Sequence, residues 1–233
     1  MGVTMEEDSM LFLIALFLVL LLPIFADIWV KYNYRKYLKV ENSSGMSGSD
    51  VAHMILDKNG IGNIRVNQAS GFLSDNYSHG KGCQAVNLSD KVYGTNTVAS
   101  LAIAAHECGH ALQDKDGYSM MRLRGSLVPI VNAVNKFSYL LVVLGVIFPF
   151  VGLGWIAVLT ISCSLLFQIV TLPVEFDASK RALQQLEDLD IVGQEEMAGV
   201  RSMLRSAALT YVAAVAASAI QLLRILAIVK RRR

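Results

Sequence analysis

Long apolar runs constrain this chain more than any other feature of its sequence. The first extends from Met10 to Ala26, a longer one from Leu127 to Val174, and the last from Ala207 to Val229. A helix needs roughly 20 mostly apolar residues to cross a bilayer. Hydrophobic residues also make up 54% of the chain, more than is usual in a soluble domain. The sequence therefore predicts a membrane protein.

We expect a mainly α-helical membrane protein with about four transmembrane helices. The predicted helices cover residues 10–30, a helical hairpin over 129–173 (about 129–148 and 154–173), and residues 207–229, the last as a transmembrane or membrane-associated helix. Pro149, Gly152 and Gly154 argue against one continuous helix through the hairpin, because proline and glycine interrupt helices.

The charges that flank the first helix predict its orientation. Lys31, Arg35, Lys36 and Lys39 follow it, interleaved with tyrosines, whereas the residues before it are acidic. Loops on the cytoplasmic side carry an excess of Lys and Arg. The acidic start also disfavours a cleaved signal peptide, which needs a basic leading region. We therefore expect a multi-pass protein of the plasma membrane whose first helix ends in the cytoplasm.

A polar module, residues 41–126, separates the first helix from the hairpin. We expect it to be a small α+β module. A loop over Asn42–Asp50 leads into a helix that stops at Gly60. Two segments, "IRVNQASGFLSDNY" and "CQAVNLSDKVYG", are typical of short strands, and Tyr77–Gly82 is expected to connect them. A long helix then begins at Asn96 or Thr97 as its N-cap.

Charge and cysteine content exclude two classes of protein. The net charge is only +2 and no basic stripe alternates with aromatic residues, so no nucleic acid partner is expected. Cys83, Cys108 and Cys163 are widely spaced and odd in number, which predicts reduced thiols rather than a disulfide framework.

The long helix carries the string "AAHECGHALQ", in which His106 and His110 are four residues apart. This spacing puts both imidazoles on one helix face, where they can bind one Zn²⁺. In such H-E-x-x-H motifs the glutamate acts as general base toward a zinc-activated water, which predicts that role for Glu107. Cys108 points away from this face and is expected to pack in the core.

Two histidines leave zinc one ligand short of the three protein ligands typical of catalytic sites. The predicted helix over 174–205 begins with "LPVEFDASKRAL", so we expect Glu175 to be the third ligand, with Asp177 as the alternative. Asp177 is four residues before Arg181, a spacing that favours an ion pair within the helix. Glu175 follows Pro173 at an expected helix start, where a carboxylate also stabilises the helix dipole.

Three segments, "FLSDNY", "VNLSDKVYGTNTVASLAIAAHECGHALQ" and "LPVEFDASKRAL", resemble the YugP-like membrane zinc metallopeptidases, the neutral zinc metallopeptidase type found in bacteria. The resemblance implies a zincin-like module over residues 41–126 and a gluzincin-like site. His106, His110 and Glu175 would then bind zinc, and Glu107 would be catalytic. In similar membrane peptidases an aspartate often stands four residues after the glutamate. Here that residue is Ser179, so Asp177 or a backbone carbonyl is expected to orient a ligand histidine.

The function expected from these features is that of a membrane-embedded, zinc-dependent endopeptidase acting on proteins or peptides near the cytoplasmic membrane face. The alternative is a non-catalytic, zinc-stabilised membrane scaffold or chaperone, which would have no use for Glu107. An extended substrate would pair with an edge strand in "GFLSDNY" or "CQAVNLSD". The residues considered as oxyanion stabilisers are Tyr77, His79, Tyr93, Tyr118 and Arg181.

Overall fold

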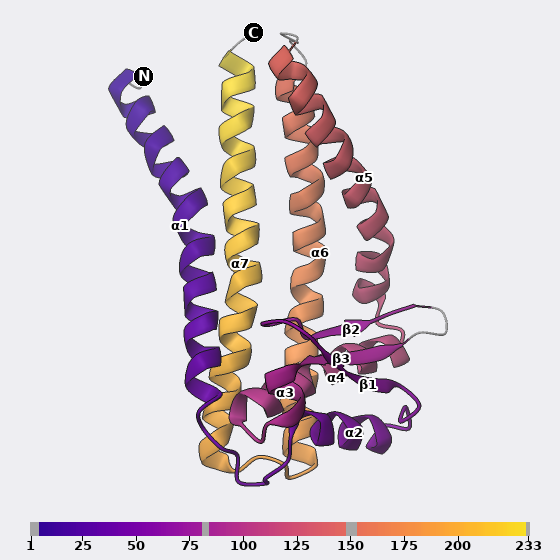
Figure 1. The fold of residues 1–233 in the computed structure, drawn as a ribbon. Coiled ribbons are helices and arrows are strands. Elements are labelled where there is room, and N and C mark those ends of the chain that lie inside the picture. The colour runs from indigo at the N-terminus through magenta and orange to yellow at the C-terminus, as the bar shows by residue number, and fades with distance from the viewer. Residues whose placement is uncertain (1–4, 81–83, 148–152, 232–233) are drawn as a thin grey trace. The chain divides into compact units, whose positions relative to one another are not determined.

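The computed structural model of the chain describes residues 5–80, 84–147 and 153–231. Long helices dominate it, and the strands of a small sheet come after the first two helices in the sequence (Figure 1). The elements are α1 (Met5–Tyr37), α2 (Gly48–Lys58), β1 (Arg65–Ala69), β2 (Asn76–Ser78), β3 (Ala85–Ser89), α3 (Asp90–Gly94), α4 (Val98–Lys115), α5 (Ser119–Ile147), α6 (Leu153–Asp188) and α7 (Gln194–Arg231).

The chain divides into two compact units. The first comprises Met1–Asp27, Leu123–Leu172 and Thr210–Arg233, and the second comprises Ile28–Arg122 and Pro173–Leu209. Among the described residues, three helical stretches are long and apolar enough to cross a membrane, namely Leu13–Tyr37, Gly154–Asp188 and Gln194–Lys230. These three stretches coincide with or overlap three of the predicted spans.

The remaining predicted span, residues 129–148, coincides with α5 but is not among these three stretches. The side chains of residues 139–147 and the predicted turn between the two hairpin helices, residues 148–152, lie outside the described part of the chain. In the described part of the first unit, a hydroxyl pair joins Ser138 of α5 to Thr160 of α6. The count of four transmembrane helices therefore stays a prediction.

The second unit contains a three-stranded sheet in the order β1-β3-β2. β1 pairs with β3 in parallel, and β2 pairs with β3 antiparallel, with Tyr77 opposite Val86. β3 is therefore the central strand, and its backbone is paired on both sides. This arrangement excludes "CQAVNLSD" as the edge on which an extended peptide could be added, and it leaves β2 from the "GFLSDNY" region as one free edge.

Capping residues position the two helices that cover the sheet. Ser47 and Asp50 form a reciprocal capping box at the start of α2. The Thr97 side chain accepts a hydrogen bond from the Ser100 amide at the start of α4. Thr97 is one of the two predicted N-caps, whereas Ser47 begins α2 within the stretch Asn42–Asp50 that was expected to be a loop.

Helix α6 differs from the expectation that a new helix begins after Pro173. The helix runs unbroken from Leu153 to Asp188 with Pro173 in its interior. A proline removes one backbone hydrogen bond, but the side chains that follow it are buried along one face at four-residue intervals: Val174, Ala178, Ala182 and Leu186. This burial holds the helix together, so Glu175 lies within a helix and not at its start.

Helices α4 and α6 touch backbone to backbone within the second unit. A Cβ atom placed on Gly109 would lie 2.5 Å from the Ala178 carbonyl oxygen and 3.2 Å from the Ala178 Cα. No side chain larger than hydrogen fits at that distance. The contact extends a core to which α2, β3 and α4 contribute Val51, Ile55, Val86, Leu88 and Leu101.

We predict that Gly109→Ala destabilises the protein by about 1–3 kcal/mol, the usual cost of overpacking. This loss should appear although alanine is the better helix former by roughly 1 kcal/mol. Gly125→Ala is the matched control, because Gly125 lies in α5 with open space around its Cβ position. Thermal unfolding of the detergent-solubilised proteins, followed by circular dichroism, makes the measurement. Equal unfolding temperatures for the two variants would contradict the close contact.

Candidate metal centre

Helix α4 presents His106 and His110 on one face, one turn apart, as the spacing predicts. Their rings are 4.8 Å apart between centroids and nearly perpendicular. The helix is almost entirely buried around them, because Ala104, Ala105, Cys108 and Ala111 pack in the core. The two imidazoles are therefore fixed by a rigid, close-packed helix.

Helix α6 brings Glu175 against both histidines. The Glu175 Oε2 lies 3.2 Å from the His106 Nε2 and 3.6 Å from the His110 Nε2. One ligand atom from each of the three residues lies within 4.8 Å of the others. The Glu175 side chain is 3% exposed, so it meets the histidines in a dry environment. Two imidazole nitrogens and one carboxylate are a donor set that suits zinc.

Gln113, which the sequence analysis did not single out, orients His110. The Gln113 amide nitrogen donates to the Val174 carbonyl at 2.7 Å and to the Asp177 carboxylate at 2.9 Å. The Gln113 oxygen must therefore be the acceptor for the His110 Nδ1, 3.0 Å away. This arrangement places the proton on Nδ1 and leaves the Nε2 lone pair directed toward Glu175.

Gln113 is fully buried and lies three residues after His110, on the same side of the helix. A polar residue at this position in an alanine-rich helix was the available signal in the sequence. The partner that makes it informative, the Val174 carbonyl, is on another helix.

Ser179 occupies the position where the similar peptidases often have an aspartate. Its hydroxyl lies 3.2 Å from the His106 Nδ1. The expected substitute, Asp177, instead reaches His110 through Gln113 and forms the predicted ion pair with Arg181 at 2.6 Å. The Ser179 hydroxyl and the Gln113 amide thus contact the Nδ1 atoms of the two histidines. The Asp177 carboxylate contacts Gln113 and not a histidine.

Glu107 is next to the three converging side chains and 8% exposed. Burial raises the pKa of Glu107 above its usual range, and the neighbouring charges of His106 and His110 offset part of this rise. Cys108, on the other side of the helix, is fully buried, and its thiol points to the Ala52 carbonyl at 3.7 Å. Its burial confirms the prediction that Cys108 packs in the core.

Three donors converge on one oxygen of Asp114, one turn beyond His110. The Tyr77 hydroxyl, the His79 Nδ1 and the Gln84 amide each lie 2.7 Å from the Asp114 Oδ2. Burial alone would raise the pKa of Asp114, but these hydrogen bonds lower it below its usual range. Strand β2 and the start of β3 are therefore tied to the end of α4.

Three of the five residues considered as oxyanion stabilisers have other side-chain partners. Tyr77 and His79 bind Asp114, and Arg181 pairs with both Asp177 and Asp116. Tyr93 packs against the hydrophobic core, and the Tyr118 amide donates to the Gln113 carbonyl. These contacts account for the positions of the five residues without assigning the oxyanion role to any of them.

Comparison with known proteins gives the family of the chain. The chain is 38% identical over 215 residues to the protein named "Putative membrane protease YugP" of Bacillus subtilis (strain 168). The aligned region covers 92% of this chain and 95% of that protein. No solved structure matches the chain. Residues 12–230 match the family described as "Putative neutral zinc metallopeptidase", and the chain therefore belongs to this family.

Proposed function

We propose that this protein is a membrane-embedded zinc metalloendopeptidase in which His106, His110 and Glu175 bind the metal and Glu107 is the general base. The observation that carries the proposal is the convergence of three ligand atoms within 4.8 Å, directly beside a buried glutamate. The family to which the chain belongs supports zinc as the metal.

The donor set fits a catalytic metal. Three protein ligands leave one position open, as in catalytic zinc sites, whereas structural sites are usually closed by four. The Nδ1 atoms of both histidines contact Ser179 and Gln113, so the Nε2 atoms, which face Glu175, are the ones that would bind a metal. When bound, zinc supplies a Lewis acid that polarises the scissile carbonyl and acidifies a water molecule.

Glu107 supplies the proton transfers of the reaction. Its carboxylate accepts a proton from the attacking water and then delivers it to the nitrogen of the departing amine. A raised pKa suits both steps, because the group must hold the proton between them. His110, fixed through Gln113 and the Val174 carbonyl, and His106, beside Ser179, keep the site assembled meanwhile.

The free edge of β2 is the proposed binding edge for an extended peptide. An added strand gains affinity from main-chain hydrogen bonds, which accept many sequences. β2 is one of the two outer strands of the sheet, and the bond from the Tyr77 hydroxyl to Asp114 ties it to α4 one turn from His110. Protein or peptide segments are therefore the proposed substrates.

A zinc-stabilised scaffold or chaperone without catalytic activity is the competing function. A scaffold would explain a metal centre in a membrane protein, but it gives no reason to bury the carboxylate of Glu107 beside the ligands. Burying a carboxylate costs free energy, and the role of general base gives a functional reason for Glu107 to be buried there. We therefore favour the peptidase.

We further propose that four helices span the bacterial plasma membrane and that the metal centre faces the cytoplasm. Lys31, Arg35, Lys36 and Lys39 favour a cytoplasmic end for the first helix. A hairpin over 129–173 would return the chain to the same side. His110 and Glu175 would then share one face, as a common metal requires.

Metal analysis combined with a casein-type cleavage assay tests the peptidase. The purified protein should contain about one zinc per chain, lose activity with a chelator and recover it with added zinc.

Glu107→Gln should keep the metal and the fold but lose about 100-fold or more of the turnover, since the amide cannot accept the proton. Asp57→Gln, an exposed acid on α2, is the control and should leave activity unchanged. Near-normal turnover of Glu107→Gln would exclude this base, and a zinc-loaded but inactive wild type would favour the scaffold.

A graded loss of metal affinity should distinguish ligands from the residues that orient them. Glu175→Ala should strip most zinc, whereas Gln113→Ala and Asp177→Ala should weaken binding by about 10–100-fold, typical of groups that hold a ligand in place. Gln184→Ala, exposed on α6, should bind zinc normally. Competition with a chromophoric chelator measures the affinity. Loss of zinc in Asp177→Ala with retention in Glu175→Ala would reverse the ligand assignment.

Cysteine labelling tests the sidedness. In a background lacking Cys83, Cys108 and Cys163, we expect His53→Cys and Glu195→Cys to be shielded from an impermeant thiol reagent in intact cells. Both positions are exposed in the second unit, so shielding would come from the membrane. Gly152→Cys, in the hairpin turn, should be labelled, and permeabilised cells provide the control for reactivity. The inverse pattern would place the metal centre outside the cell.

A further inference from the structure

A basic groove lies along the last turns of α1. Its volume is about 400 Å³, and it is lined by Ile28, Lys31, Tyr32, Arg35, Lys36 and Lys39. Four of these six residues are cations and none is an acid. The whole chain carries a net charge of only +2, so this groove concentrates positive charge far beyond the average of the protein.

The groove lies on the outer face of the helix. Val30 and Tyr34 of the same turns are buried in the hydrophobic core, and the Asn33 side chain accepts a hydrogen bond from the Ser202 hydroxyl of α7. Arg35 and Lys36 of the same turns are exposed. One face of α1 thus packs against the core, and the face that carries the groove is available to a ligand outside the chain.

Three of the four cations that line the groove form no ion pair with an acid in the described part of the chain. Among the described residues, no carboxylate forms an ion pair with Arg35, Lys36 or Lys39, and the Lys36 ammonium lies 5.0 Å from the centre of the Tyr37 ring. Cations held together at this density repel one another unless an anion lies between them. Charge complementarity therefore favours an anionic occupant.

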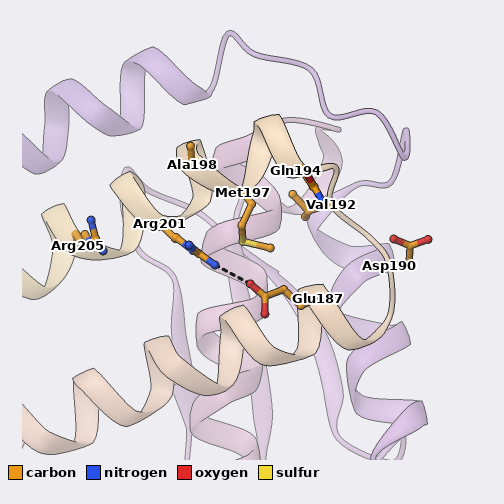
Figure 2. Close-up of a pocket in the computed structure, with 8 residues that line it drawn as sticks. All are labelled: Glu187, Asp190, Val192, Gln194, Met197, Ala198, Arg201 and Arg205. Atoms are coloured by element: carbon orange, nitrogen blue, oxygen red, sulfur yellow. Dashed lines mark hydrogen bonds and ion pairs between the residues drawn. The ribbon is translucent and has the colours of Figure 1, made fainter.

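A second charged cavity, of about 690 Å³, differs in this respect. It lies between the end of α6 and the start of α7, and its arginine Arg201 already binds Glu187 at 2.9 Å (Figure 2). Asp190 also lines it, while Arg205 lies one turn further along α7 (Figure 2). Its two acids balance its two bases, so it is a poorer site for an anion than the groove on α1.

The residues around the groove indicate which anion it meets. The apolar run Met10–Ala26 ends two residues before it. Ile28 is 60% exposed, and Trp29 stacks on Tyr32 with their ring centroids 6.0 Å apart. An apolar helix followed by exposed aromatic rings and then by cations matches the order of hydrocarbon, interface and phosphate in a bilayer.

We propose that the groove formed by Lys31, Arg35, Lys36 and Lys39 binds the phosphate of anionic phospholipid headgroups. The site selects anionic over zwitterionic lipids, because a phosphate that keeps its net negative charge gains more from several cations than one paired with choline. This lipid site is independent of the proposed peptidase activity, since it shares no residue with the metal centre.

Fluorescence quenching of Trp29 tests the proposal directly. The full chain carrying Trp155→Phe has Trp29 as its remaining tryptophan. It is reconstituted into phosphatidylcholine vesicles with graded fractions of brominated phosphatidylglycerol or, in parallel, brominated phosphatidylcholine. We expect quenching by the anionic lipid to saturate at several-fold lower fractions, and this preference to decline with added salt as surface electrostatics are screened. Equal quenching curves for the two lipids would overturn the proposal.

Charge-matched variants make the test specific to the groove. Arg35→Gln, Lys36→Gln and Lys39→Gln combined should reduce the preference by about tenfold or more, since each cation near an anionic surface contributes several-fold. Lys58→Gln, Arg65→Gln and Lys91→Gln combined remove the same charge from exposed positions elsewhere and should leave it unchanged. Equal losses in the two triple variants would show an effect of net charge and would refute a site. Displacement by inorganic phosphate, but not by chloride at equal ionic strength, would identify free phosphate as the ligand instead.

Discussion

The close contact of α4 with α6 is the constraint on which the metal centre depends. Gly109 and Ala178 bring two backbones together at a distance that excludes any side chain at Gly109. The contact joins His106 to Glu175, which are 69 residues apart in the sequence. An imidazole and a carboxylate reach only a few ångströms from their helices, so a wider separation would leave the three ligand atoms unable to meet.

The same contact buries polar groups between α4 and α6, and Gln113 forms hydrogen bonds with them. Polar groups buried between two helices need hydrogen-bond partners. Gln113 is fully buried and uses both ends of its amide, binding the Val174 carbonyl and the Asp177 carboxylate on α6 and His110 on its own helix. The group that stabilises the helix contact is therefore also the group that sets the tautomer of a candidate ligand.

Helix α1 shows how one continuous element serves two environments. In the second unit its inward face packs Val30 and Tyr34 into the core, and its outward face carries the basic groove. Before that, its sequence is a nearly uninterrupted apolar run. Hydrophobic burial and interfacial electrostatics act on different faces and different turns, so they do not compete for the same residues.

The sequence by itself determined the features that depend on local spacing. The apolar runs predicted three of the long helical stretches, Thr97 was one of the two predicted N-caps of α4, and the four-residue spacing placed His106 and His110 on one face. These features follow from the geometry of a single helix. Glu175 was predicted from the number of ligands that zinc requires, and the structure brings its carboxylate to both histidines.

Only the tertiary structure decided the rest, because it depends on pairs of elements. The order β1-β3-β2 made β3 central and left β2 as a free edge. The alternation of polar and apolar residues within each strand cannot reveal this order. The continuity of α6 past Pro173 came from burial against other elements, which outweighed a local signal to stop. The contacts of Ser179 with His106 and of Gln113 with His110 and α6 likewise require the packed fold. A side chain's hydrogen-bond partner on another helix is fixed by distance in space, and spacing along the chain does not encode it.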